Sequence, residues 1–207
     1  MEGLQSVGIG YCAKHFPTLA NTGNTDFDDK IIEFKMPIEQ LHIAERYTPL
    51  IAHNLPAIMM SHVVFTGSCS PDTTNPASLS KDWINMLRND LGFQGLIITD
   101  GVGALSLKAF THSNTIRESM AKATLQAYKA GVDLVLGGAE TYQTLRNAVL
   151  RCEIPIEQVR ASAKRIKAFH ERFPTFKPSI NQDLKAQLET EAKSLYKDIT
   201  GQNIQDN

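Results

Sequence analysis

Four short apolar runs stand out along the chain, at residues 7–13, 57–65, 96–99 and 132–136. The third, Leu-Ile-Ile-Thr, shows no alternation of polar and apolar positions, which is typical of a parallel strand that is covered on both faces. Each run ends near Gly, His or Asp residues. The pattern therefore predicts buried strands whose carboxyl ends carry polar groups.

Helical spacing of apolar residues fills the stretches between and after these runs, at residues 38–54, 80–90, 114–130, 140–151 and 155–172. Pro37 suits the start of the first helix, Ser80 suits the N-cap of the second, and Gly131 closes the third. Strands that alternate with helices of this length predict an α/β fold with a parallel sheet. About four βα units can form an open sheet or half of an eight-stranded barrel, and half a barrel leaves two open sheet edges that invite self-association.

The composition changes after Pro174. Residues 176–179 read as a linker, and a segment rich in Lys and Glu follows at 184–199. Its narrow apolar stripe predicts a helix that packs on the domain or on a neighbour, with a frayed tail as the alternative; the stripe consists of Leu184, Leu188, Ala192 and Leu195. We expect one domain over residues 1–173 and a linker with a helical extension over 174–207.

Charge and cysteine usage exclude several classes of function. Basic and acidic side chains number 21 and 22, which gives a formal net charge of −1 and offers no basic surface for nucleic acid. Cys12, Cys69 and Cys152 lack metal-ligand spacing, so we expect buried, reduced thiols and no metal or organic cofactor. The first residues lack a signal-peptide pattern, and no apolar segment is long enough to span a bilayer. These observations predict a cytoplasmic protein without a membrane partner.

Asp100 is the first candidate for a catalytic group. It directly follows the apolar run 96–99, and Gly101 and Gly103 come next, which allows a sharp turn and the approach of a ligand. In α/β barrels the chemistry lies at the carboxyl ends of the strands. The alternative is that Asp100 caps a helix after the strand.

Three blocks of sequence resemble family 3 glycoside hydrolases, specifically bacterial β-N-acetylglucosaminidases (β-hexosaminidases) that trim cell-wall fragments. The first is Lys-His-Phe-Pro at 14–17, and the second is Pro-Ala-Ile-Met-Met-Ser-His at 56–62 with Pro-Ala-Ser-Leu-Ser at 76–80. The third is Leu-Gly-Phe-Gln-Gly-Leu-Ile-Ile-Thr-Asp at 91–100, and Gly-Val-Asp-Leu-Val-Leu at 131–136 adds the following strand. The resemblance covers residues 1 to about 173 and implies the C-terminal half of a (β/α)8 TIM barrel, with an N-acetylglucosamine-containing glycan as substrate.

The resemblance also implies roles for individual residues. Asp100 takes the position of the nucleophile in a retaining mechanism. Lys14 and His15 take positions that hydrogen-bond sugar hydroxyls, and a nearby Lys14 would hold Asp100 ionised. His62 ends the next strand, where it either lines the cleft or supports it from behind. Without the resemblance, Lys14 and His15 read as an ordinary polar strand end.

Two departures from the family pattern bear on activity. The loop 18–29 lacks the histidine that serves as acid/base in the resembled enzymes; Asp26 can stand for its Asp partner, and the histidine position falls on Phe27 or Asp28. Asp28 could donate a proton only if its pKa were raised well above about 3.9, and the alternative is a set of solvated loop aspartates. After Asp100, the usual Asp-Leu-x-Met is replaced by small residues.

The resemblance begins part-way through the family barrel, so the sugar-binding residues of the first strands have no counterpart in this sequence. We therefore expect weak or no turnover by this polypeptide alone, and an N-terminal half chain or a homo-oligomer as partner. A degenerate, non-catalytic half-barrel that retains carbohydrate binding is the alternative. A third reading is a half-barrel that binds a phosphorylated ligand at Gly137 and Gly138, ahead of the helix at Glu140.

Overall fold

The computed structural model describes residues 2–174, 186–187, 189–194 and 197. The chain divides into two compact units, Met1–Pro174 and Thr175–Asn207, and the described residues of the second unit are helical. The expected linker, and Leu184, Leu188 and Leu195 of the expected tail helix, lie outside the described residues. The fold and the site below concern the first unit.

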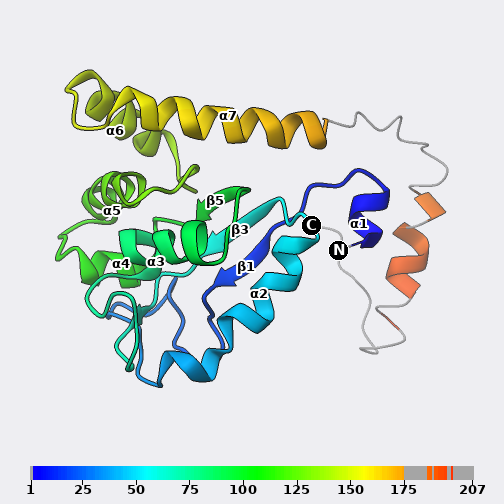
Figure 1. The fold of residues 1–207 in the computed structure, drawn as a ribbon, viewed down its shortest axis with the longest axis horizontal. Coiled ribbons are helices and arrows are strands. Elements are labelled where there is room, and N and C mark those ends of the chain that lie inside the picture. The colour runs from blue at the N-terminus through cyan, green and yellow to red at the C-terminus, as the bar shows by residue number, and fades with distance from the viewer. Residues whose placement is uncertain (1, 175–185, 188, 195–196, 198–207) are drawn as a thin grey trace. The chain divides into compact units, whose positions relative to one another are not determined.

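Three parallel strands form the main sheet: β1 (Ala13–Phe16), β3 (Ala57–Met60) and β5 (Leu96–Thr99). They lie side by side in chain order, with β3 in the middle (Figure 1). Leu134 continues the order on the far side of β5 through a parallel bridge to Ile98. An α/β fold with a parallel sheet is therefore present, as the alternation of apolar runs and helical segments predicts.

The strand boundaries differ from the apolar runs. The run at 7–13 is not a strand: Val7 and Ile9 are exposed, Gly8 has a positive φ of 70°, and β1 begins only at Ala13. The run at 57–65 splits, because its end forms β4 (Val64–Phe65), which pairs in parallel with β2 (Glu33–Phe34) in a second, two-stranded sheet. That second sheet was not predicted, since two-residue strands leave no periodicity to read.

Helices follow the strands much as expected. Their bounds are α1 (Glu2–Ser6), α2 (Ile43–Ala52), α3 (Lys81–Asn85), α4 (Leu105–Phe110), α5 (Ile116–Ala130), α6 (Ala139–Leu150) and α7 (Ile156–Arg172). Ser80 Oγ accepts a hydrogen bond from Trp83 N–H, which confirms the N-cap, and Gly131 ends α5 with a φ of 119°. A 3₁₀ turn at Ile38–Leu41 precedes α2, and a π-helical turn at Met86–Asp90 follows α3, so two predicted helices are each broken into two pieces.

Aromatic rings join the sheet to its helices. Trp83 of α3 lies 5.1 Å from the Phe65 ring and 6.1 Å from the Phe16 ring, and Tyr47 of α2 lies 4.9 Å from Phe16, all measured between centroids. The side chains of Trp83, Phe16 and Phe65 are completely buried. Such tilted and edge-on pairs stabilise a core beyond the area that they bury. They fix the end of β1, which carries the first candidate site residues.

A buried carboxylate ties the start of β5 to two helical segments. Asp133 Oδ2 accepts hydrogen bonds from Arg88 (2.6 Å) and from Ile97 N–H (3.0 Å), and its Oδ1 accepts one from Ser162 of α7 (3.1 Å). Only 1% of the Asp133 side chain is exposed. Buried charges of this kind must be paired, and here the pairing anchors the strand that ends at Asp100.

The expectation that the cysteines are buried was wrong. Cys12, Cys69 and Cys152 are free thiols, and all three are exposed. Cys69 and Cys152 have positive φ angles of 58° and 57°, so both stand in tight turns at the surface rather than in the core. Within the part of the chain that is described, no helix is long and apolar enough to cross a membrane, and no group of three or more His, Cys, Asp or Glu side chains is arranged to hold a metal ion.

Candidate active site

Asp100 is the first residue after β5, and its carboxylate is held by two contacts. Oδ2 lies 3.2 Å from Nε2 of His15, and Oδ1 accepts the N–H of Gly101 at 2.8 Å. The contact with His15 is the main cause that lowers the Asp100 pKa to about 2, burial opposes it, and the Gly101 N–H adds to it. The side chain is 18% exposed, so an ionised carboxylate faces an accessible space at neutral pH.

The sheet brings His15 and Asp100 together from strands that are not neighbours. Two backbone hydrogen bonds continue the pairing at the carboxyl ends of the strands: Ser61 N–H donates to Phe16 O, and Asp100 N–H donates to Met60 O. The ends of β1, β3 and β5 therefore stay in register. The backbone oxygen of His15 also accepts the Tyr47 hydroxyl at 3.2 Å. The Lys14–His15 and Phe16–Pro17 peptide bonds are both cis.

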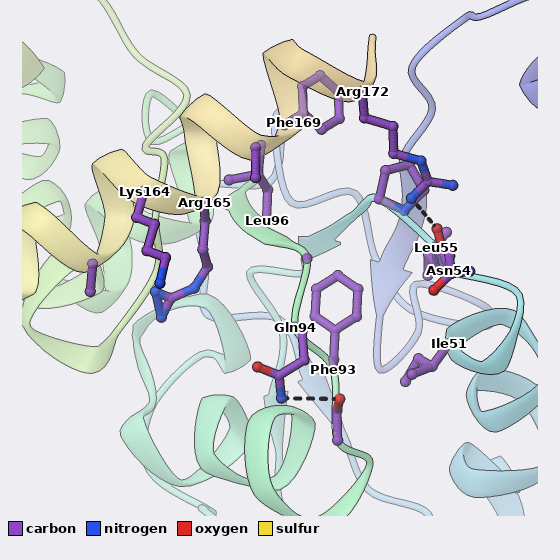
Figure 2. A pocket seen from close by; sticks show the side chains of 15 residues that line it. Ile51, Asn54, Leu55, Phe93, Gln94, Leu96, Lys164, Arg165, Phe169 and Arg172 are labelled. Atoms are coloured by element: carbon purple, nitrogen blue, oxygen red, sulfur yellow. Dashed lines mark hydrogen bonds between the residues drawn. The ribbon is translucent and has the colours of Figure 1, made fainter.

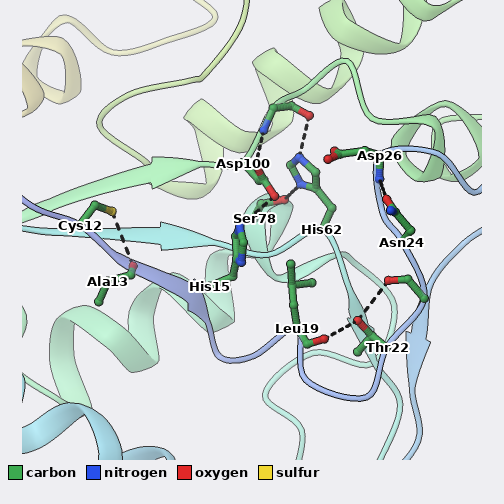
Figure 3. A network of polar contacts seen from close by, with 12 residues as sticks. Cys12, Ala13, His15, Leu19, Thr22, Asn24, Asp26, His62, Ser78 and Asp100 are labelled. Carbon is green, nitrogen blue, oxygen red and sulfur yellow. Dashed lines mark hydrogen bonds and ion pairs between the residues drawn. The ribbon is translucent and has the colours of Figure 1, made fainter. Parts of the chain in front are cut away.

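His62 lies behind this carboxylate rather than on its open side. Its ring is 1% exposed, Nδ1 is 2.7 Å from the Ser78 hydroxyl, and Nε2 is 3.0 Å from the Gly101 carbonyl oxygen (Figure 3). Burial lowers the pKa of His62, and the charge of Asp100 works against that effect. Because both ring nitrogens are occupied, His62 suits the supporting role, one of the two roles that its position allowed.

Lys14 precedes His15 in β1. It is exposed on β1, and it lines a cavity of about 390 Å³ together with His15, Thr18 and Arg46. The largest effects that lower the pKa of Asp100 come from His15, the Gly101 N–H and His62. Lys14 lines a cavity together with His15, where it can meet a ligand.

The loop 18–29 directs Asp26, and not Asp28, towards the cluster. The Asp28 carboxylate lies 3.7 Å from Lys30 Nζ and is 36% exposed. The Asp26 carboxylate points towards the His62 ring, whose pKa it raises after the larger effects of burial, Asp100 and Gly101 (Figure 3). Asn24 Oδ1 accepts the Asp26 N–H at 2.9 Å, which sets the turn that decides which aspartate faces inward.

The structure does not support a phosphate-binding site at Gly137 and Gly138. Helix α6 begins directly after Gly138, but the Glu140 carboxylate occupies its first turn and lies 3.7 Å from Arg117. A negative side chain at a helix N-terminus repels the anion that the same dipole would attract.

A second cavity, of about 750 Å³, lies at the opposite end of the strands. Figure 2 shows it beneath α7, where Leu55 stands just before β3 and Leu96 begins β5. Lys164, Arg165 and Arg172 of α7 contribute its positive charges. Because Asp100 follows the other end of β5, this cavity does not belong to the candidate site.

Comparison with known proteins settles the family. Residues 1–169 match the model of the glycosyl hydrolase family 3 N terminal domain. The chain belongs to this family. The resemblance seen in the sequence is thereby confirmed.

Relatives of this family 3 chain extend well beyond the matched region. An uncharacterized secreted glycosyl hydrolase of Arthroderma benhamiae is 28% identical over 176 residues, which cover 80% of this chain and 47% of the relative. A beta-hexosaminidase of Histophilus somni is 32% identical over 146 residues, which cover 66% of this chain and 37% of the relative. The chain thus spans less than half the length of these two relatives.

Solved structures show the same fold. A family 3 beta-N-acetylglucosaminidase from Paenibacillus sp. str. FPU-7 superposes with a TM-score of 0.69 at 24% identity, covering 87% of this chain and 35% of that one. The beta-N-acetylglucosaminidase from Thermotoga maritima superposes with a TM-score of 0.65 at 22% identity, covering 86% and 38% respectively.

Sequence reasoning missed two parts of the site. Ser78 lies in a block that the resemblance singles out, but its contact with His62 spans 16 residues, and only the folded chain brings the two together. The carbonyl of Gly101 was missed because a backbone acceptor leaves no mark in the sequence.

Proposed function

We propose that the Asp100 cluster is the nucleophile side of a retaining glycoside hydrolase site that acts on O-glycosyl bonds of N-acetylglucosamine-containing glycans. The observation that carries the proposal is a carboxylate at a strand end whose pKa is lowered to about 2 by His15 and the Gly101 N–H. A retaining nucleophile must be ionised to attack the anomeric carbon and form the glycosyl-enzyme. Membership of glycosyl hydrolase family 3 and the similarity to beta-hexosaminidases support this chemistry.

The proton donor is the weak part of the proposed site. Retaining enzymes place their second carboxyl group about 5–5.5 Å from the nucleophile, and that group must be protonated when the leaving group departs. No histidine occurs between residues 18 and 29, Asp28 lies beside Lys30, and Asp26 is directed at His62. We therefore expect slow turnover of substrates whose leaving group needs a proton.

The parallel order of β1, β3 and β5, followed by the bridge at Leu134, supports a partial (β/α)8 barrel of about four βα units. In this proposal an N-terminal half chain or a second copy supplies the remaining strands and sugar contacts. A cytoplasmic role in cell-wall recycling stays a prediction, which cell fractionation would check.

An activated substrate tests the nucleophile without requiring a proton donor. The chain, with and without a supplied N-terminal half, is incubated with a dinitrophenyl N-acetyl-β-glucosaminide that carries a ring fluorine to slow hydrolysis of the adduct. Intact-mass and peptide analysis should show one glycosyl group on Asp100. Asp100→Asn should abolish the adduct, and Asp28→Asn is the matched control that should retain it. Absence of any adduct in both settings would refute the proposed activity.

The second candidate is a non-catalytic carbohydrate-binding domain. It is favoured by Phe27, which is 78% exposed and is one of the two residues, with Asp28, on which the expected acid/base position falls. In this case chitooligosaccharide titration should perturb the NMR signals of residues near Lys14 and His15, and Lys14→Ala should weaken binding, while no adduct forms on Asp100.

A further inference from the structure

The contacts of His62 determine which of its ring nitrogens carries the proton. The carbonyl oxygen of Gly101 can only accept a hydrogen bond, so Nε2, at 3.0 Å, must donate. In a neutral ring the other nitrogen is then an acceptor, and the Ser78 hydroxyl, at 2.7 Å, must donate to Nδ1. The arrangement selects a neutral ring with its proton on Nε2.

The surroundings of the ring favour the neutral form. His62 is 1% exposed and Ser78 is fully buried, so a charged imidazolium would have little water. Burial lowers the His62 pKa most; Asp100, the Gly101 carbonyl and Asp26 raise it, and His15 lowers it further. These are the groups from β1, from the end of β5 and from the loop 18–29 that act on the ring.

Gly101 is the residue that most needs such a contact. A side-chain carbon added at Gly101 would meet no atom within 4 Å, so the side-chain position of this residue is open. Glycine also has more accessible backbone conformations than other residues. Three hydrogen bonds limit it: its N–H donates to Asp100 Oδ1 at 2.8 Å, and its carbonyl oxygen accepts from His62 Nε2 at 3.0 Å and from Ala104 N–H at 3.1 Å. Of these, the bond from His62 is the one made by a side chain outside the turn.

We propose that His62 is a positioning residue whose Nε2–H form, selected by Ser78, holds Gly101 so that the Gly101 N–H stays on the Asp100 carboxylate. The bond acts on the nucleophile through the backbone and needs no contact between His62 and a sugar. The importance of these hydrogen bonds for catalysis rests on the proposed function, but the hydrogen bonds themselves can be measured without substrate.

Nitrogen-15 NMR of the histidine-labelled 207-residue chain tests the proton position directly. The expected His62 spectrum has a protonated Nε2 and an unprotonated, hydrogen-bonded Nδ1, with no titration between about pH 5 and 8. Ser78→Ala should move the Nδ1 signal towards that of a free acceptor. A proton on Nδ1, or a His62 that titrates near its ordinary pKa, would overturn the proposal.

Two substitutions separate the hydrogen bond from the volume of the ring. His62→Leu removes the donor, and His62→Gln retains an N–H near the position of Nε2. Loss of one hydrogen bond should raise amide exchange at Gly101 about tenfold in His62→Leu and less in His62→Gln. The carbon-13 titration of the Asp100 carboxyl should move upwards in the same order. Unchanged exchange and titration in His62→Leu, or in Ser78→Ala if His62→Leu does not fold, would overturn the inference whether or not a glycosyl adduct forms on Asp100.

Discussion

His15 Nε2 and Asp100 Oδ2 lie 3.2 Å apart although their strands, β1 and β5, are separated by β3. The contact joins the two outer strands of the three-stranded sheet at their carboxyl ends. It therefore does two things at once: it keeps the carboxylate ionised, and it adds a tertiary bond across the sheet. The ionised carboxylate matters for the proposed reaction. The added bond should contribute to the free energy of unfolding, where it can be measured.

The pH dependence of stability should report this contact. The Asp100 pKa is about 2 in the folded chain, below the value of about 3.9 for an unperturbed Asp, so folding is favoured above the unfolded pKa and the gain is lost as the pH falls through the folded pKa. Asp100→Asn should cost about 1–2 kcal/mol at pH 7, and the difference from the parent chain should shrink between about pH 4 and 2. Urea unfolding of the parent chain and of Asp100→Asn at several pH values measures this difference in the free energy of unfolding. A difference that is the same at pH 7 and pH 2 would contradict the assignment.

The sequence predicts Asp100 as a candidate because it directly follows an apolar run, and in α/β barrels the chemistry lies at the carboxyl ends of the strands. Family resemblance placed His15 in the same site as a sugar-binding residue and named Lys14, rather than His15, as the group that holds Asp100 ionised; the contact between His15 and Asp100 appears only in the folded chain. The choice between Asp26 and Asp28 could not be predicted, since it depends on the turn that Asn24 caps with its side chain. The first strand was placed too early because Val7 and Ile9 are apolar but exposed, and apolar composition alone does not show burial.

The buried Asp133 should be much more sensitive to substitution than its neighbours at the surface. Asp133→Ala leaves Arg88 without its carboxylate and Ile97 N–H without an acceptor, so we expect a loss of about 3–5 kcal/mol. Arg165→Gln is the control: its guanidinium is 3.6 Å from Asp133 and 32% exposed, and its loss should cost about 1 kcal/mol or less. Trp83 is the single tryptophan of the chain and is buried, so its fluorescence can follow unfolding. Equal losses in both variants would argue against a buried anchor.

Asp72 organises the loop before α3. Burial raises its pKa, but hydrogen bonds from Ser80, Thr74 and Asn75 together lower it to about 2. Asp72→Ala removes all of these acceptors and should destabilise the chain by about 1–2 kcal/mol. Asp72→Asn keeps one acceptor oxygen and should lose less. Thermal unfolding at pH 7 compares the two, and an equal loss would mean that the charge, rather than the hydrogen bonds, is responsible.

Gly67 follows β4 at a point where the neighbouring backbone leaves no room for a side chain. A side-chain carbon there would lie 1.8 Å from the Met36 carbonyl oxygen, because the segments after β2 and β4 continue side by side and Ile38 N–H donates to Ser68 O. The obstacle is backbone, so it cannot rotate away, and Gly67→Ala should cost about 3 kcal/mol. Gly103→Ala is the matched control, since nothing lies within 4 Å of the added carbon, and its stability should change by less than about 0.5 kcal/mol. Urea unfolding of both variants decides the matter: comparable stabilities would show that β2 and β4 do not approach as closely as the structure places them.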